Sequence, residues 1–316
     1  MTDKVCLMVS NDLASYGFPS GHPFGTDRQD AFLGRARTHG LDTKARILGS
    51  REATRGELER FHTVDYVNRV IVKSQQGVGY LDYGDTPAFV GVFEVSSHVV
   101  GAALTALDAV MAGACKRSFQ PIGGLHHARR DRAAGFCVFN DVGVLIETLR
   151  AQYGVRRIAY VDIDVHHGDG LYYPFESDPH VIIADIHEDG DYLYPGTGHA
   201  WETGKGVAEG TKLNVAMPPG AGDAEFLRHW EYVEAHLAKF RPEFFLLQCG
   251  ADSLGGDPIA HLRYTAAAHR YAAKRLCVLA DEYAGGRLMA FGGGGYNRSN
   301  IALAWNAVLE ALIEAP

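Results

Sequence analysis

The sequence contains few cysteines, and their positions do not suggest a disulfide framework. Its 316 residues include five cysteines, none of them in a Cys-x-x-Cys pair. They are Cys6, Cys115, Cys137, Cys249 and Cys277. An odd, scattered set in a long chain does not match the framework of a small secreted domain, so we expect a reducing compartment.

Long hydrophobic runs and an excess of positive charge are also absent. No apolar stretch approaches the roughly 18 residues of a membrane-spanning helix, and the first residues show no signal-peptide cleavage site. The net charge of −8 argues against nucleic-acid binding, which needs clustered Lys and Arg. We therefore expect a soluble cytoplasmic protein with neither a membrane nor a nucleic-acid partner.

Apolar residues make up 47% of the chain, enough for a sizeable core. Short apolar runs without strict alternation predict strands buried on both faces, and amphipathic segments predict helices. The predicted strands are Val5–Val9, Ile158–Ile163, Val181–Ile186, Lys212–Ala216, Phe244–Cys249 and Leu288–Phe291. The predicted helices cover about 93–112, 140–152, 223–238, 265–283 and 299–313. This pattern predicts an α/β fold with a mainly parallel sheet, and the absence of linkers and repeats favours one domain over residues 1–316.

Polar, glycine-rich segments follow several predicted strands. They are Asp162–Gly170, Cys249–Pro258 and Gly292–Asn297, and a fourth, Gly123–Asn140, precedes a helix. Ligand sites of open α/β sheets lie beyond the carboxyl ends of the strands. We therefore expect these segments to form the active site.

The segment DIDVHHGDG has the residues of a metal site. Asp162, Asp164 and His166 alternate and project on one side of an extended chain, and Asp252 follows another strand. A bound cation would relieve the repulsion among these carboxylates. Carboxylate and imidazole ligands suit zinc, and three protein ligands leave a position open for water. The alternative is a capping and hydrogen-bonding cluster at the strand end.

A histidine pair and a tyrosine supply the remaining chemistry. His126 and His127 lie in a glycine-flanked segment, where one could act as a base near neutral pH. Asp162 and Asp169 are the natural partners for their second ring nitrogens. Tyr296 follows a run of glycines and could donate a hydrogen bond to an oxyanion. The alternative is a solvated or structural histidine pair.

These segments together resemble a known family. GGLHHARRDRAAGFCVFND, YVDIDVHHGDG, CGADSLGGDP and FGGGGYN are similar to motifs of the histone deacetylase family, which includes acetoin-utilisation-type proteins and acetylpolyamine amidohydrolases. Ser20–Arg28 resembles its N-terminal motif, and Asp85–Ala88 its substrate loop. The resemblance covers about residues 20–310 in the family's order.

The resemblance implies an arginase/deacetylase fold with helices on both faces of the sheet, and a zinc-dependent deacylase. The implied zinc ligands are Asp164, His166 and Asp252, and the implied catalytic residues are His126, His127, Asp162, Asp169 and Tyr296. His127 would be general base and then general acid, held by Asp169. His126 would be its electrostatic partner, held by Asp162. Tyr296 would polarise the scissile carbonyl.

The resemblance also implies a substrate tunnel and a monovalent-cation site. The implied substrate-binding residues are Asp85, Leu125, Gly135, Phe136, Tyr194, Ile259 and Gly294. K⁺ or Na⁺ would be held by Asp162, Asp164 and the carbonyls of His166 and Ile186. Arg28 would lie near a channel through which the acid product leaves.

Several positions depart from the family's pattern. Ile259 stands where polyamine-specific relatives carry Glu, which favours acyl-lysine or another acylated amine over an acetylpolyamine. Leu125 replaces the Trp of many nuclear members, Tyr194 stands where Phe is common, and Asp185 stands where Ser is frequent. No long insertion lies between Gly21 and Asp65, which disfavours the dimer of polyamine relatives.

Two other readings compete with this one. Arginases share the architecture but hold two manganese ions through more Asp and His ligands. A non-catalytic protein could keep the pocket and recognise acyl groups, but it would be expected to lose a ligand, His127 or Tyr296. Acetylpolyamines and other small acyl-amines remain the alternative substrates, and iron remains an alternative to zinc.

Overall fold

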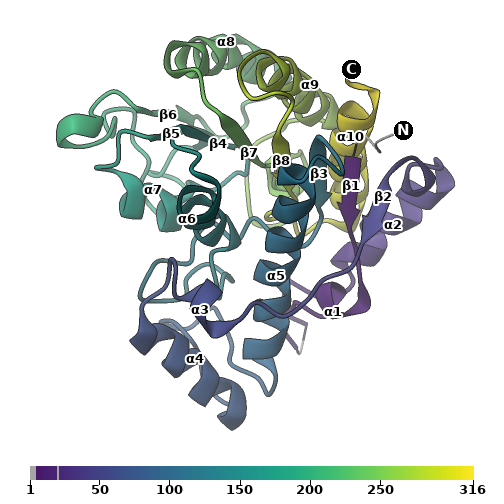
Figure 1. Ribbon diagram of the computed structural model, residues 1–316, viewed down its shortest axis with the longest axis vertical. Helices are drawn as coiled ribbons and strands as arrows, with labels where there is room; N and C mark the ends of the chain where they lie inside the picture. The colour runs from purple at the N-terminus through teal and green to yellow at the C-terminus, as the bar shows by residue number, and fades with distance from the viewer. Residues whose placement is uncertain (1–4, 20) are drawn as a thin grey trace.

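One parallel sheet organises the molecule. The computed structural model describes residues 5–19 and 21–316, and its eight described strands follow the order β2-β1-β3-β8-β7-β4-β5-β6, with all neighbours parallel (Figure 1). The strands are β1 (Val5–Met8), β2 (Arg46–Leu48), β3 (Arg117–Gln120), β4 (Ile158–Asp162), β5 (Val181–Glu188), β6 (Lys212–Met217), β7 (Phe244–Gln248) and β8 (Leu288–Phe291). Met1–Lys4 and Ser20, the first residue of the N-terminal motif, lie outside the described residues.

Helices cover both faces of this sheet (Figure 1). The α-helices are α1 (Asn11–Ala14), α2 (Arg28–Thr38), α3 (Arg55–Leu58), α4 (Val64–Gln76), α5 (Val92–Met111), α6 (Asp141–Tyr153), α7 (Asp169–Phe175), α8 (Asp223–Phe240), α9 (Ala266–Tyr283) and α10 (Arg298–Glu314). Helix α5 packs on β1, β3 and α6, while α8, α9, α10 and α2 pack successively against one another. The predicted α/β fold with a parallel sheet is confirmed.

The two strands that the sequence did not predict, β2 and β3, are short. Strand β3 reads RSFQ, yet it is buried along its whole length. Arg117 can lie there because its guanidinium donates to both carboxylate oxygens of Asp281 at 2.7 Å. Strand β2 is an edge strand of three residues with two exposed positions. Neither therefore shows the apolar run that marks the buried strands.

One cysteine pair departs from the expectation. Cys6 of β1 and Cys115, just before β3, form a disulfide although 109 residues separate them in the sequence. The pairing follows from topology, because β1 and β3 are neighbours in the sheet. Cys137, Cys249 and Cys277 are free and buried. Residue spacing alone gave no sign of this contact.

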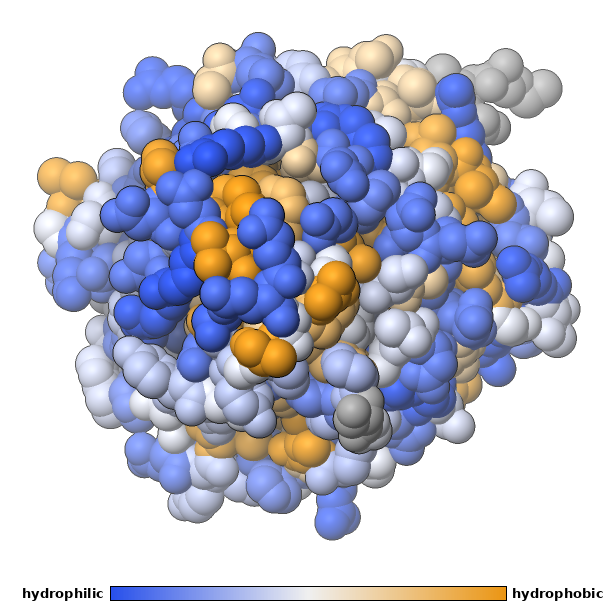
Figure 2. All heavy atoms as spheres, turned by 90° about the horizontal axis from the view of Figure 1, so that it is seen from below, coloured by the Kyte–Doolittle hydropathy of each residue, from blue (hydrophilic) through white to orange (hydrophobic). Residues whose placement is uncertain are grey.

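The surface carries no extended apolar face in the view of Figure 2, where hydrophobic side chains form separate patches among polar and charged ones. Among the described residues, no helix is long and apolar enough to cross a membrane.

Candidate active site

Four neighbouring strands bring the predicted site residues together. In the sheet, β3, β8, β7 and β4 are consecutive. Their carboxyl ends lead into His126 and His127, Tyr296, Asp252, and Asp164, respectively. Because parallel strands end at one edge of the sheet, segments far apart in the sequence meet at a single place.

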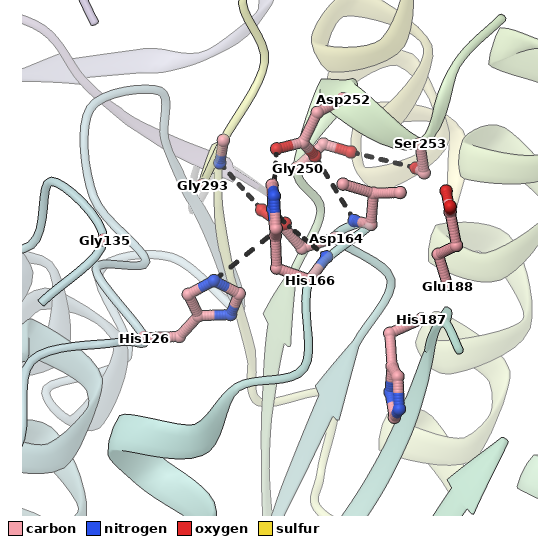
Figure 3. A network of polar contacts seen from close by, with 12 residues as sticks. His126, Gly135, Asp164, His166, His187, Glu188, Gly250, Asp252, Ser253 and Gly293 are labelled. Carbon is pink, nitrogen blue, oxygen red and sulfur yellow. Dashed lines mark hydrogen bonds and ion pairs between the residues drawn. The ribbon is translucent and has the colours of Figure 1, made fainter. Parts of the chain in front are cut away.

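The three predicted metal ligands converge at the bottom of this site (Figure 3). Ligand atoms of Asp164, His166 and Asp252 all lie within 4.8 Å of one another, and all three residues are buried. His166 Nδ1 lies 3.0 Å from Asp164 Oδ1 and 3.4 Å from Asp252 Oδ2. Asp252 Oδ2 has no hydrogen-bond partner among the described residues. A buried carboxylate oxygen without a hydrogen bond is costly, so this donor set fits a divalent cation.

Glycines keep space free around these carboxylates. A Cβ at Gly294 would lie 2.9 Å from Asp164 Oδ2, and a Cβ at Gly250 would lie 2.7 Å from Asp252 Oδ1. Gly294 also donates its backbone N–H to Asp164 Oδ2 at 2.8 Å. The glycine run after β8 thus packs its backbone directly against the candidate metal ligands.

The two histidines each have a carboxylate partner. His126 Nδ1 donates to Asp162 Oδ2 at 2.8 Å, and His127 Nδ1 donates to Asp169 Oδ1 at 2.7 Å. Their Nε2 atoms face each other at 3.1 Å. The partners that the sequence analysis expected are therefore the ones found in the structure.

The surroundings give the two rings opposite charge preferences. Burial lowers the pKa of His126, but Asp162 and Asp164 raise it more, to about 9. Burial and the neighbouring His126 lower the pKa of His127 to about 4, against the opposing effect of Asp169. The pair thus favours a charged His126, whose Nε2–H donates to the unprotonated Nε2 of a neutral His127.

Tyr296 stands across the site from the histidines. Its ring packs edge-on against Phe136 at 5.8 Å and Phe24 at 6.4 Å. Burial and then the negative charge of Asp252 raise its pKa well above 10, so its hydroxyl stays a hydrogen-bond donor. The backbone N–H of Tyr296 donates to Asp257 Oδ2 at 2.8 Å, which anchors it.

Arg28 lies beneath the glycine run. Its buried guanidinium donates to the carbonyls of Gly293 and Gly295 at 2.6 and 3.0 Å and lies over the ring of Phe24. This contact supports the segment that carries Tyr296. A role for Arg28 in product exit stays a prediction.

A cavity of about 260 Å³ leads to the histidines and Tyr296. It is lined by Asp85, His127, Gly135, Phe136, His166, Leu193, Tyr194, Ile259 and Tyr296. We call this cavity the tunnel. Leu125 and Gly294 line a smaller inner space below it. Every predicted substrate-binding residue therefore lies on one of these two cavities.

The wall at Gly135 and Phe136 has an unusual backbone. Both residues have positive φ angles, 53° and 66°, and a side chain on Gly135 would collide with the ring of His127. Phe136 is held by its N–H, which donates to Thr86 Oγ1 at 3.1 Å, and by its carbonyl, which accepts from Tyr16 at 2.7 Å. These bonds offset the strain of the left-handed conformation.

The residues of the predicted monovalent-cation site lie at the ends of β4 and β5. Asp162 Oδ1 accepts the N–H of Asp164 at 3.0 Å. Asp185 is bound by His187 Nδ1 at 2.7 Å and by the N–H of Gly168 at 2.9 Å. The side chain that departs from the family's Ser therefore has protein partners, and the cation itself stays a prediction.

Several residues of the site escaped the sequence analysis. Arg129 donates to Asp169 Oδ2 at 2.7 Å, and the Tyr160 hydroxyl donates to Asp162 Oδ2. Leu193 lines the tunnel, and Asp257 anchors Tyr296. Arg129 lies two residues after His127, and Asp257 lies within the motif CGADSLGGDP, so the positions of both indicated a place near the site. Tyr160 lies in the apolar run of β4 and Leu193 in the loop after β5, and neither position gave a signal.

Comparison with known proteins agrees with this geometry. The histone deacetylase domain matches residues 22–312. The chain is 36% identical to the acetoin utilization protein AcuC of Bacillus subtilis (strain 168) over 94% of this chain and 78% of that protein. It is 34% identical to AcuC of Staphylococcus aureus (strain MSSA476) over 100% of this chain and 83% of that protein.

A solved structure gives the same result. The crystal structure of the HDA15 HD domain superposes with a TM-score of 0.90 at 28% identity, covering 99% of this chain and 89% of that one. Domain match, relatives and structural neighbour agree, and the chain belongs to the histone deacetylase family.

Proposed function

We propose that this protein is a zinc-dependent deacylase that hydrolyses the amide of an acylated amine, most simply an acetyl-lysine-type substrate. The observation that carries the proposal is the convergence of three groups at the bottom of one tunnel. These are the Asp164–His166–Asp252 cluster, the carboxylate-paired histidines and the Tyr296 hydroxyl.

The candidate ligands fit zinc in number and type. Two carboxylates and one imidazole with an unpartnered buried oxygen match the three-ligand set of catalytic sites, which leaves room for water and substrate. Zinc, when bound, would polarise the scissile carbonyl and lower the pKa of the attacking water.

His127 would move the proton. Its Nδ1–H is held by Asp169, so Nε2 is the nitrogen that can accept a proton, and the low pKa keeps it unprotonated before the reaction. His127 takes a proton as water attacks the carbonyl carbon and then returns it to the leaving amine nitrogen. His126, charged beside Asp162, adds positive charge next to the reacting atoms.

Tyr296 would stabilise the oxyanion. Its neutral hydroxyl donates a hydrogen bond to the carbonyl oxygen, and this bond strengthens as negative charge develops there. The aromatic contacts with Phe24 and Phe136 and the backbone bond to Asp257 fix its position before substrate arrives. Such prepositioning avoids reorganisation during the reaction.

The tunnel supports an extended, uncharged chain as its occupant. Phe136, Leu193 and Tyr194 give it apolar walls, and Ile259 at the rim offers no charge to a polyamine. Asp85 at the same rim can accept N–H groups of the substrate backbone. These features favour acyl-lysine, while acetylpolyamines remain the alternative class.

An activity panel with zinc-loaded protein tests the proposal. It would compare acetyl-lysine peptides, acetylspermidine and lysines with longer acyl chains, measuring the released acid. We expect the peptides to be the best substrates and Tyr296→Phe to lower kcat about 10²–10³-fold. Release of acid from none of these substrates would contradict the proposal, and a large preference for acetylspermidine would contradict its substrate assignment.

We also propose that residues 1–316 act as one catalytic domain in the cytoplasm and that K⁺ or Na⁺ stabilises the end of β4. The unbroken sheet and the absence of a spanning helix among the described residues are compatible with the first statement. The carboxylates of Asp162 and Asp164, two residues apart at the strand end, support the second.

A further inference from the structure

A second cavity opens beside the tunnel mouth. It has a volume of about 490 Å³, and we call it the side pocket. Its walls include Asp82, Asp85, Arg129, Arg132, Tyr194 and Pro195. Asp85 and Tyr194 line both the tunnel and the side pocket. The tunnel and the side pocket therefore adjoin at these two residues.

The carboxylates of the side pocket bind to the protein through some of their oxygens, whereas Asp82 Oδ2 has no hydrogen-bond partner among the described residues. Asp82 Oδ1 accepts the backbone N–H groups of Gly84, Asp85 and Thr86 at 2.9–3.1 Å. Asp169 is bound by His127 and Arg129. Burial and the neighbouring Asp82 raise the pKa of Asp85 to about 7. The acidic wall is therefore less negative at Asp85. Asp82 keeps its charge, because burial raises its pKa but the hydrogen bonds from Asp85, Thr86 and Gly84 lower it more.

The two arginines of the side pocket differ in their bonding. Arg129 donates to Asp169 at 2.7 Å and lies over the ring of Tyr173. Arg132 pairs with Asp131, its neighbour in the sequence, at 3.7 Å, which is too long for a hydrogen bond. Asp131 is 62% exposed and Arg132 is 39% exposed. Arg132 is thus the guanidinium whose donors are available to a ligand in the pocket.

We propose that the side pocket binds the α-carboxylate of an acyl-lysine, with Arg132 as its specificity-determining residue. In lysine, four methylene groups separate the side-chain nitrogen from the α-carbon, so with the amide at the histidines the α-carbon lies near the tunnel mouth. The planar fork of a guanidinium matches a carboxylate in two hydrogen bonds. Asp85 faces the same space and can accept the substrate's α-N–H.

This inference rests on the proposed deacylase function and narrows its substrate class. The preferred substrate would be a free acyl-lysine or one at the carboxyl end of a peptide. An acyl-lysine within a chain has no α-carboxylate, and an acylpolyamine has neither group.

Binding of a non-hydrolysable substrate analogue tests the inference independently of turnover. The probe is the methyl-ketone isostere of acetyl-lysine with a blocked α-amine, prepared as the free acid, as the carboxamide and as a carboxamide-capped dipeptide with glutamate. Calorimetry would compare wild type, Arg132→Gln, Arg132→Lys and Arg228→Gln. Arg228 is a matched control, because it is 66% exposed on α8 and does not line the pocket.

We expect wild type and Arg228→Gln to bind the free acid about tenfold more tightly than the carboxamide. This difference in affinity is what one exposed hydrogen bond to a charged group contributes. Arg132→Gln should lose this preference without weaker binding of the carboxamide, and Arg132→Lys should keep part of it. Equal affinity of wild type for acid and carboxamide would overturn the inference, as would a preference that survives Arg132→Gln. If the glutamate dipeptide, and not the free acid, binds more tightly than the carboxamide, the side pocket recognises the carboxylate of a neighbouring side chain. That result would overturn the α-carboxylate assignment.

The two proposals fail in different ways. If the deacylase proposal is wrong, no acid is released from any acyl-amine. The ratio of the affinities for the free acid and the carboxamide does not depend on turnover and tests only the role of Arg132. A wild-type protein that turns over internal acyl-lysine peptides and binds both isosteres equally would keep the proposed function and exclude the side-pocket inference.

Discussion

Replacing Gly294 with alanine should remove zinc while leaving the fold intact. The new Cβ would overlap Asp252 Oδ2 and would lie 2.9 Å from both Asp164 Oδ2 and the Cγ of Asp252, whereas ordinary contacts begin at 3.4 Å. The φ angle of Gly294 is outside the left-handed region, so the effect is steric and not a backbone conflict. Because the space is closed by two carboxylates, the methyl group can fit only if they move.

The size of this movement decides the outcome. The Cγ of Asp252 must shift by at least about 0.5 Å to restore ordinary contact, and its Oδ2 must shift further. Metal–ligand distances tolerate only about ±0.2 Å, so we expect zinc affinity to fall by about 100-fold or more. Deacylase turnover at limiting zinc should fall in parallel.

Competition with a chromophoric zinc chelator measures this affinity, and circular dichroism checks the fold. Gly34→Ala is the matched control, because Gly34 is exposed within α2 and its new Cβ meets nothing within 4 Å. That control should keep wild-type zinc affinity and gain about 0.5–1 kcal/mol of stability. Wild-type zinc affinity in Gly294→Ala would refute the assignment of Asp164 and Asp252 as ligands.

Two further predictions follow from hydrogen bonds around the histidines. Asp169→Asn should lower kcat about 10²–10⁴-fold with little change in KM, because it disturbs the tautomer of His127, and unchanged kcat in steady-state assays would exclude this role. His62, whose Nδ1 donates to Arg129 O and whose Nε2 accepts from Asn140 N–H, has its pKa lowered by burial to about 3. As pH falls, His62 therefore takes up a proton in the unfolded chain at a higher pH than in the folded protein. The free energy of unfolding of the wild type should fall by about 2 kcal/mol through His62 between about pH 7.5 and pH 5. Urea titrations should show a shallower loss in His62→Gln, and equal pH slopes would contradict this account.

The sequence predicted the α/β class and the residues that meet at the candidate site because both follow from local patterns. Strands such as β4 and β7 are apolar up to their last residue and buried along their whole length. The segments after them carry carboxylates and imidazoles in spacings that few other functions need. The histidine–carboxylate pairs could be predicted because a ligand or base needs a partner on its second nitrogen.

Features that depend on which strands are neighbours could not be predicted in this way. The order β3-β8-β7-β4 brings the histidines, Tyr296, Asp252 and Asp164 to adjacent strand ends, yet nothing local encodes it. The disulfide between Cys6 and Cys115 has the same origin. Strand β3 was missed because a buried arginine with a distant partner, Asp281, looks polar in the sequence.

The central claim is that one zinc ion, held by Asp164, His166 and Asp252, is required for deacylation. The most direct test removes metal with a chelator, titrates zinc back and follows both bound zinc and acid release from an acetyl-lysine peptide. The account predicts that turnover rises with zinc and saturates at one equivalent per chain, and that Asp252→Ala remains folded but inactive. Turnover that survives chelation, or that needs two equivalents of manganese as in an arginase, would contradict it.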